Sequence, residues 1–384
     1  MTADLACYNV ADLRERARRR LPRGIWEYAE RGVEDETGMA RNRAAFERVT
    51  FRPRVLRGVH AVDTATEIFG KPTSFPLALA PTGAAGLLWY NGDLALARAA
   101  AAAGVPFTIS SASTMDLEEI AIAGGRLWFQ LYYWEDRTLS HAVVDRAQDL
   151  GCEALFITLD MPVPPNREYI HRSGFGTPFS LNARNTLDVL THPRWLAGVL
   201  GRYALAGGIP SQANLPDRLR ARVTKGAAPG ALFKQDDLDW EAIKLLRDRW
   251  RGKFLLKGIL HPEDAQQALA LGADGVVVSN HGGRALDSAI ASIDALPEIV
   301  SAVGGRMTIL LDSGVRRGSD VVKAVALGAD AVLAGRAPLY GLAAAGEPGV
   351  ARALELLRSE TARTMAMLGA CSVGEIDSAL LGSR

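Results

Sequence analysis

The sequence has few cysteines, no excess of charge and no long apolar run. Its three cysteines, Cys7, Cys152 and Cys371, are scattered, so they form neither a disulfide framework nor a metal-binding motif, and we expect no metal site. Sparse cysteine use of this kind favours a reducing cytoplasm. No run of about 18 apolar residues occurs, and the N-terminal residues lack the apolar core of a signal peptide. We therefore expect a cytoplasmic protein that is at most peripheral on the inner face of a membrane.

The charge balance gives no sign of a nucleic-acid partner. Lysine and arginine total 44 and aspartate and glutamate total 43, for a formal net charge of +1. Any basic surface must therefore be local, and we expect no binding of nucleic acid. Apolar residues make up 48% of the 384 residues, which is enough for an α/β barrel of about 250 residues with extensions.

From residue 77 onward, short apolar runs alternate with helical stretches. Apolar runs without polar interruption are typical of parallel strands that are buried on both faces. Eight such runs predict a closed (β/α)₈ TIM barrel. They cover residues 77–80, 105–109, 127–130, 154–158, 253–257, 275–278, 307–311 and 331–334.

The rest of the chain extends this barrel. We expect residues 1–76 to form an N-terminal helical cap and lead-in, and residues 77–372 to form the barrel itself. Residues 175–233 interrupt the barrel after its fourth strand, and residues 373–384 form a C-terminal tail. The interruption is too long for an ordinary connection between a strand and a helix.

An internal repeat supports the barrel. Residues 268–280 and 324–336 match nearly position for position at an offset of 56, which corresponds to two strand-helix units. A looser copy at residues 151–160 aligns Thr158 with Ser279 and Asp160 with His281. Strand residues two apart point the same way, so we expect both pairs to face the barrel mouth.

The insertion at 175–233 carries seven basic residues against two acidic ones, together with the apolar stretch at 195–200. Long loops on barrels commonly cover a site, so a lid or an oligomer contact is one interpretation. The other is a surface that docks on an anionic membrane. The basic residues of the insertion are Arg184, Arg194, Arg202, Arg218, Arg220, Arg222 and Lys225.

The stretch from Ser279 to Asp287 places a base and a cation beside two glycines at the end of an apolar strand. Reacting groups of barrel enzymes cluster at this end of the strands, so His281 is a candidate general base. A carboxylate beside an imidazole fixes its tautomer and stabilises its charged form, and Asp160 is placed to do this. Arg167 and Arg284 together can grip a substrate carboxylate.

Two glycine-arginine loops follow the last two predicted strands. Gly314 and Arg316 follow the seventh strand, and Gly335 and Arg336 follow the eighth. Backbone amides and guanidinium groups in these loops suit a phosphate group. Lys257 ends an apolar strand, and burying its ammonium is costly unless an anion lies nearby.

These motifs resemble those of the FMN-dependent α-hydroxy acid oxidase and dehydrogenase family, which includes glycolate oxidase, lactate oxidase and mandelate dehydrogenase. The segments SNHGGRALD at 279–287, DSGVRRGSD at 312–320 and GR at 335–336 carry the resemblance, which extends from about Tyr8 to Leu368. Over the whole sequence, the chain is most similar to the mandelate dehydrogenase branch. The resemblance implies FMN as the cofactor and oxidation of an L-2-hydroxy acid to the 2-oxo acid.

The resemblance also implies a role for each site residue. His281 removes the substrate proton, Asp160 stabilises the charged imidazole, and Tyr132 hydrogen-bonds the substrate hydroxyl. Arg167 and Arg284 hold the carboxylate. Lys257 lies at the pyrimidine edge of the flavin, where its cation favours electron transfer into the cofactor. The FMN-binding residues are Pro81, Thr82, Gly83, Ser110, Gln130, Thr158, Lys257, Ser279, Asp312, Gly314, Arg316, Gly335 and Arg336.

Two positions depart from the family pattern. Trp26 occupies the place assigned to a tyrosine that helps bind the carboxylate, and Tyr28 is about 200° away on a helix, so it is a poor substitute. Gly83 replaces an alanine that is common in relatives that use oxygen, and it opens space beside the flavin. We therefore expect an aryl or larger aliphatic, mandelate-like substrate. A quinone or electron carrier is favoured as acceptor over oxygen, and a homo-oligomer, specifically a tetramer, is expected.

Several alternatives remain at this stage. One is an oxidase that passes electrons from lactate or glycolate to oxygen and forms hydrogen peroxide. A second is a flavin-free barrel isomerase or aldolase that binds a phosphorylated substrate at the same loops. A third is a ligand-binding scaffold without activity. The sequence also leaves open whether electrons leave the substrate as a carbanion pair or as hydride.

Overall fold

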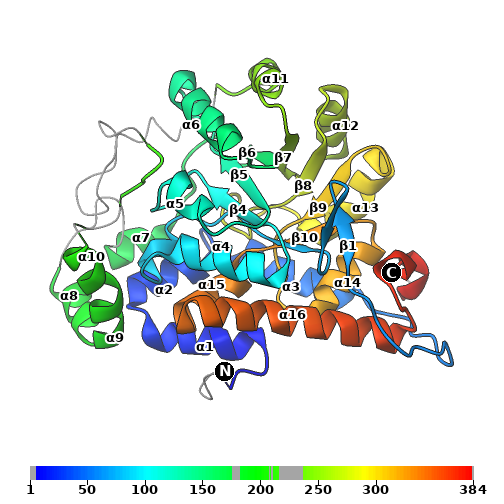
Figure 1. The fold of residues 1–384 in the computed structure, drawn as a ribbon, viewed down its shortest axis with the longest axis horizontal. Helices are drawn as coiled ribbons and strands as arrows, with labels where there is room; N and C mark the ends of the chain where they lie inside the picture. Colours follow the sequence, from blue (N-terminus) through cyan, green and yellow to red (C-terminus); the bar gives the residue numbers. More distant parts are fainter. Residues whose placement is uncertain (1–5, 175–181, 207, 209–210, 216–236, 383–384) are drawn as a thin grey trace.

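The computed structural model describes residues 6–174, 182–206, 208, 211–215 and 237–382. Its centre is a closed barrel of parallel strands in which β10 pairs with β3, and each strand pairs with the next along the chain (Figure 1). The predicted (β/α)₈ fold is confirmed. The barrel strands are β3 (Leu77–Leu79), β4 (Phe107–Ser110), β5 (Leu127–Leu131), β6 (Ala154–Thr158), β7 (Lys253–Ile259), β8 (Gly275–Val278), β9 (Thr308–Leu311) and β10 (Ala331–Ala334).

One end of the barrel is closed by a short hairpin that the sequence did not specify. Strands β1 (Thr66–Ile68) and β2 (Lys71–Thr73) pair antiparallel, and Ile68 joins the buried cluster inside the barrel. The Phe69 ring packs on Trp128 with centroids 5.3 Å apart. Because this hairpin covers the N-terminal end of the strands, the open mouth lies at their C-terminal end, where barrel sites form.

Helices surround the barrel (Figure 1). At the N-terminus, α1 and α2 are separated by Pro22, which precedes the first turn of α2, where a missing N–H is tolerated. Helix α1 packs on α15, and α15 packs on α16. The helices are α1 (Val10–Arg20), α2 (Arg23–Glu30), α3 (Thr37–Arg48), α4 (Gly92–Ala103), α5 (Leu117–Ala121), α6 (Arg137–Asp149), α11 (Trp240–Arg249), α12 (Pro262–Ala270), α13 (Ser292–Val303), α14 (Gly318–Ala326), α15 (Arg336–Ala345) and α16 (Glu347–Leu368).

The described part of the insertion is helical and lies beside the barrel mouth, on the left of Figure 1. It contains α8 (Ala183–Leu190), α9 (Pro193–Trp195), η2 (Leu196–Gly201) and α10 (Arg202–Leu205), and α7 (Glu168–Ser173) precedes it. The predicted basic residues Arg218, Arg220, Arg222 and Lys225 lie outside the described residues.

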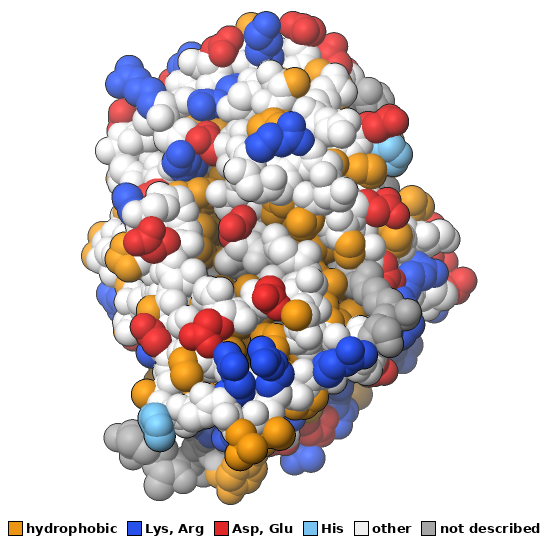
Figure 2. Space-filling view, turned by 90° about the vertical axis from the view of Figure 1, so that its right-hand side faces the viewer, with side chains coloured by type: hydrophobic (Ala, Val, Ile, Leu, Met, Phe, Trp, Pro, Cys, Tyr) orange, Lys and Arg blue, Asp and Glu red, His pale blue; other side chains and the backbone are white. Residues whose placement is uncertain are grey.

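The surface on the right-hand side of Figure 1 carries charges of both signs (Figure 2). Apolar side chains form only small groups there, and several of them lie with basic side chains near the lower edge of the view. In the described ranges of the chain, no helix combines the length and the apolar character needed to cross a bilayer.

Candidate active site

The turn after β8 holds His281 in an unusual backbone conformation. His281, Gly282 and Gly283 have φ angles of 57°, 68° and 72°, which lie in the left-handed region that disfavours residues with a Cβ atom. Ser279 Oγ accepts a hydrogen bond from the His281 N–H (3.0 Å), and Ser313 Oγ accepts one from the Gly282 N–H (2.8 Å). These bonds stabilise the strained turn, which aims the imidazole into the barrel mouth.

His281 lies between a carboxylate and a phenol. Its Nδ1 is 2.9 Å from Asp160 Oδ1, and its Nε2 is 3.4 Å from the Tyr132 hydroxyl. Burial lowers the pKa of His281, Asp160 opposes this shift, and Lys257 adds to it. Burial also raises the pKa of Tyr132, so its hydroxyl keeps its proton. A neutral imidazole beside a protonated phenol can accept a proton from a bound molecule.

Asp160 lies on the Nδ1 side of the His281 ring. Burial raises the pKa of Asp160, but His281 and Lys257 outweigh burial and hold that pKa below its usual value. Room for this carboxylate comes from a bulge in β7, where Gly258 has a φ of 102°. A Cβ atom at Gly258 would lie 2.6 Å from the Asp160 Cβ, so only glycine fits there. The alignment of Asp160 with His281 in the sequence repeat therefore reflects a direct contact.

Ser279, which is expected to contact the flavin, lies directly beneath two residues that line the cavity, Lys257 and Asp312. Ser279 is fully buried and does not line the cavity at the barrel mouth. Its Oγ donates to Asp312 Oδ2 (2.7 Å) and accepts from Lys257 Nζ (3.1 Å). Lys257 also forms an ion pair with Asp312 at 3.2 Å, and this is the anion that its burial requires. Ser279 therefore positions Lys257, Asp312 and the His281 turn from below the cavity.

A chain of side-chain hydrogen bonds crosses the ends of three neighbouring strands. Ser110 Oγ donates to Gln130 Oε1 (2.9 Å), and Gln130 Nε2 donates to Thr158 Oγ1 (2.9 Å). These bonds fix the orientation of the Gln130 amide, and all three residues line the cavity. The loop after β3 completes this wall with Pro81, Thr82 and Gly83.

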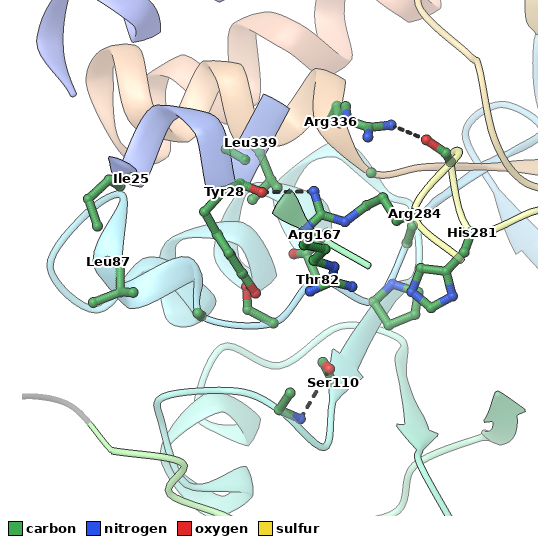
Figure 3. Close-up of a pocket in the computed structure, with 18 of the residues that line it drawn as sticks. Ile25, Tyr28, Thr82, Leu87, Ser110, Arg167, His281, Arg284, Arg336 and Leu339 are labelled. Atoms are coloured by element: carbon green, nitrogen blue, oxygen red, sulfur yellow. Dashed lines mark hydrogen bonds between the residues drawn. The ribbon is translucent and has the colours of Figure 1, made fainter. Parts of the chain in front are cut away.

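Two partly buried arginines, Arg167 and Arg284, face the same space as His281 (Figure 3). Arg284 Nη1 donates to the backbone carbonyls of Tyr28 (2.8 Å) and Arg31 (2.9 Å). The Arg167 Nε is buried and has no hydrogen-bond partner. Burial lowers the pKa of Arg167, and the nearby Arg284 lowers it further. Two guanidinium groups, one of them with an unbonded N–H donor, have the chemistry to bind a carboxylate.

The expected role of Trp26 is wrong, because this side chain does not line the cavity. Its ring packs on Tyr340 with centroids 5.9 Å apart, and the Arg14 guanidinium lies 5.4 Å from it. Tyr28 lines the cavity instead, and its hydroxyl donates to the Gly83 carbonyl (3.2 Å). The two residues are about 200° apart on α2, so a helix that turns one toward the site turns the other away. Packing of Trp26 on Tyr340 of α15 determines which side of α2 faces the cavity.

The two glycine-arginine loops also meet at this cavity. Gly314, Arg316, Gly335 and Arg336 all line it. Arg336 is buried with its Nε unpartnered, and burial, followed by Arg284 and Arg316, lowers its pKa to about 10. A buried guanidinium with other cations close by favours binding of an anion, and a phosphate group fits.

The start of α14 has no free backbone N–H group to offer a phosphate at Arg316, Arg317 or Gly318. The Gly318 N–H donates to Glu360 and the Arg316 and Arg317 N–H groups donate to Asp320, so this helix is already capped. Arg317 itself pairs with Glu360 at 2.8 Å and does not line the cavity. The start of α15, at Gly335 and Arg336, is the helix end that faces the cavity.

The cavity has a volume of about 880 Å³ and joins the phosphate end, the polar strand ends and the two arginines. The volume and polar groups fit FMN together with a small carboxylic acid. Sequence reasoning missed several apolar lining residues, because they come from the cap, the insertion, the loops after the strands and α15, and their orientation depends on packing. These are Ile25, Leu87, Ala112, Met161, Val189, Leu190, Trp195, Leu200 and Leu339.

Comparisons with known proteins agree with this site. The chain is 44% identical over 363 residues to (S)-mandelate dehydrogenase of Pseudomonas putida, covering 94% of this chain and 90% of that protein. It is 42% identical over 373 residues to L-lactate dehydrogenase of Ectopseudomonas mendocina (strain ymp), covering 96% and 97%.

Solved structures give the same result. A monotopic membrane (S)-mandelate dehydrogenase is similar with a TM-score of 0.92 at 41% identity, covering 99% of this chain and 100% of that one. A mandelate oxidase is similar with a TM-score of 0.81 at 39% identity, covering 99% of each chain.

Residues 17–383 match the family described as FMN-dependent dehydrogenase. This match sets aside the flavin-free isomerase and the inactive scaffold as interpretations of the barrel. It also agrees with the converging cations and the polar strand ends, which suit the phosphate and the ring of FMN. The chain is an oxidoreductase of the FMN-dependent dehydrogenase family, and its cofactor is FMN.

Proposed function

We propose that this enzyme oxidises an L-2-hydroxy acid to the 2-oxo acid, with His281 as the base. The observation that carries the proposal is the contact of His281 with Asp160 (2.9 Å), in a cavity that also contains Tyr132, Arg167 and Arg284. A hydroxy acid offers each group a partner. Its carboxylate suits the arginines, and its hydroxyl suits Tyr132 and His281.

Each side chain has a separate task in this reaction. Arg167 and Arg284 fix the carboxylate, so the substrate carbon bearing the hydroxyl faces His281. His281 holds the proton that the substrate loses, and Asp160 stabilises the resulting imidazolium. Tyr28 adds a polar group on the other side of the cavity, in place of the role first assigned to Trp26.

When FMN is bound, it supplies the acceptor for the two electrons that the substrate loses. Lys257, paired with Asp312, places a cation beside the polar strand ends and favours a cofactor that gains negative charge. The residues proposed to hold FMN are Pro81, Thr82, Gly83, Ser110, Gln130, Thr158, Lys257, Ser279, Asp312, Gly314, Arg316, Gly335 and Arg336.

An aryl or larger aliphatic, mandelate-like acid is the proposed substrate. A Cβ atom at Gly83 would lie 3.1 Å from the Ala112 Cβ and 3.4 Å from the Tyr28 hydroxyl. Gly83 therefore keeps a Cβ atom out of the tight gap between Ala112 and Tyr28, which a larger residue would crowd. The relatives named above act, by their names, on mandelate and on L-lactate, and the apolar walls favour the larger side chain.

A quinone or electron carrier is the proposed acceptor, and the insertion is the proposed membrane contact. Leu187, Leu190 and Leu205 are exposed on α8 and α10, near the basic residues Arg194 and Arg202. One relative is described as a monotopic membrane protein, although the mandelate in its name is a small, water-soluble acid. A membrane location is more useful for reaching a lipid-soluble acceptor than for reaching such a substrate. The alternative is an oxidase that forms hydrogen peroxide, as the similarity to mandelate oxidase allows.

One experiment tests the reaction and its acceptor. The purified yellow protein is mixed anaerobically with acids from glycolate to mandelate, and flavin bleaching is followed before oxygen is admitted. We expect fastest bleaching with mandelate and slow return of colour in oxygen. His281→Gln should slow bleaching by roughly a hundredfold to ten-thousandfold. Near-normal bleaching by this variant would disprove the role of His281, and rapid reoxidation would identify an oxidase.

A homo-oligomer, specifically a tetramer, is also proposed. Val55 and Leu56 are strongly exposed in the loop between α3 and β1, which projects from the body at the lower right of Figure 1. Leu56 also adopts a left-handed backbone with a φ of 59°. Light scattering should give a multiple of 41.1 kDa, and Leu56→Asp should shift it toward the single-chain mass. A single-chain mass for the unmodified protein would refute the proposal.

A further inference from the structure

The cavity continues beyond the proposed substrate and FMN groups into an apolar extension. We call this the outer arm, and it is lined by Ile25, Leu87, Val189, Leu190, Trp195 and Leu200. In Figure 3, Ile25 and Leu87 lie beyond Tyr28, on the side away from His281. The outer arm therefore begins where the groups that hold a hydroxy acid end.

The outer arm is preformed by hydrogen bonds between the insertion and the rest of the molecule. Trp195 Nε1 donates to the Leu87 carbonyl (2.8 Å), so the indole, which is 2% exposed, forms a fixed wall. The Arg23 N–H donates to Asp188 Oδ2 (2.7 Å), which joins α2 to α8. These bonds hold the two sides of the arm at a set distance, as expected of a binding site.

The outer arm opens next to an exposed apolar and basic surface. Leu190 lines the arm and is also 60% exposed, so it marks the exit toward solvent. Arg20 lies close by, with its guanidinium 4.1 Å from the Trp89 ring. Burial and the nearby Arg194 lower the pKa of Arg20 to about 10. An apolar passage that ends among leucines and cations suits a molecule with an apolar tail that arrives from a lipid surface.

We propose that the outer arm binds the apolar tail of a quinone, which is the electron acceptor. This inference rests on the proposed function and adds the place where the tail of its acceptor binds. The 2-oxo acid leaves first, and the quinone then enters the same cavity through the arm. It takes up the two electrons and two protons that the hydroxy acid gave up, and it leaves as the quinol. Oxygen would need no apolar passage, and a mandelate-sized acid held at the arginines would leave the arm unfilled.

Two leucines on α8 provide a matched test. Leu190 is 60% exposed and lines the arm, whereas Leu187 is 64% exposed and does not. Leu190→Glu places a carboxylate in the passage, while Leu187→Glu makes the same chemical change beside it. Both sites are exposed, so both variants should fold, and Leu190→Gln is a milder substitute. None of these residues belongs to the groups that hold FMN or the hydroxy acid.

The probes are decyl-benzoquinone and the same benzoquinone without its tail, in buffer free of lipid and detergent. The unmodified holoenzyme should bind the decyl form at least about tenfold more tightly by calorimetry, and should oxidise with a correspondingly higher kcat/KM, because each buried methylene favours binding. Leu190→Glu should abolish this tail dependence, and Leu187→Glu should retain it. Anaerobic bleaching by the hydroxy acid should be equal in all three proteins.

The outcomes separate this inference from the proposed function. Absence of bleaching with every hydroxy acid would refute the proposed function, while calorimetry on the oxidised protein still tests the arm. Equal binding of the two quinones, or equal behaviour of the two glutamate variants, would refute the arm as a quinone site. If Leu190→Glu instead slowed bleaching by long-chain hydroxy acids alone, the arm would belong to the substrate and the inference would be wrong.

Discussion

At His281, burial has more effect on the pKa than the neighbouring carboxylate. Burial and Lys257 lower the pKa of His281, and Asp160 offsets only part of that shift. The acid limb of kcat/KM should therefore lie below the ordinary histidine pKa of about 6.5, because the base must be neutral to act. Activity is lost as the pH falls through the His281 pKa and is complete above it.

Asp160→Asn separates the two effects of the carboxylate. The change removes the group that raises the pKa of His281, so the acid limb should move to lower pH. Turnover should still fall by roughly a hundredfold or more, because the imidazolium loses the anion that stabilises it. A pH profile of kcat and kcat/KM measures both effects. An acid limb that moved to higher pH, or an unchanged kcat, would contradict this account.

The two aromatic residues of α2 give a second prediction at the residue scale. Tyr28→Phe removes a hydroxyl that faces the cavity, so the KM for the hydroxy acid should rise by roughly threefold to tenfold. Trp26→Phe should leave KM and kcat within about twofold, because Trp26 packs on Tyr340 outside the cavity. Steady-state kinetics on both variants are the measurement. The reverse pattern would restore Trp26 as the substrate-binding residue.

At the scale of the loops, two arginines in the segments after β9 and β10 have different surroundings. Arg336 lines the cavity with an unpartnered Nε, whereas Arg317 is half-exposed and paired with Glu360. Arg336→Gln should weaken FMN binding by at least about tenfold, because a charge-assisted contact with phosphate is lost. Arg317→Gln should leave FMN affinity unchanged. Recovery of free flavin fluorescence on dilution measures the affinity, and equal loss in both variants would contradict the assignment.

The strands were predictable from the sequence, whereas several other elements were not. The barrel strands are buried on both faces over most of their length, so their mainly apolar runs indicate their positions. The hairpin formed by β1 and β2 has only short strands with exposed Lys71 and Pro72, and such patterns are ambiguous. Its position follows from the Phe69 contact with Trp128, which depends on residues distant in sequence.

At the scale of the whole molecule, the described insertion helices and the end of α16 lie on opposite sides (Figure 1). Leu205 on α10 is 92% exposed, and Met367 near the end of α16 is 69% exposed. If α10 contacts a membrane, Leu205→Glu should reduce binding to vesicles with anionic lipids by several-fold, and salt should weaken it further. Met367→Glu is the control. Co-sedimentation measures binding, and equal effects of the two changes would refute the contact.

The division into cap, barrel, insertion and tail remains a prediction, as does the tetramer. The membrane contact through residues 175–233 is also only a proposal, and four of its basic residues lie outside the described part of the chain. The fold class and the cofactor are established by the closed barrel and by the family match.

By itself, the sequence determined the barrel and the polar residues at its strand ends, because a strand fixes side-chain direction with a period of two. It thereby paired Asp160 with His281 across two strands. Only the tertiary structure decided which cap and insertion residues face the cavity. The phase of α2 brings Tyr28 inward and leaves Trp26 outside, and the tight turn after β8 buries Ser279 beneath it. Helix phase and turn geometry depend on packing against distant elements, which a local pattern does not encode.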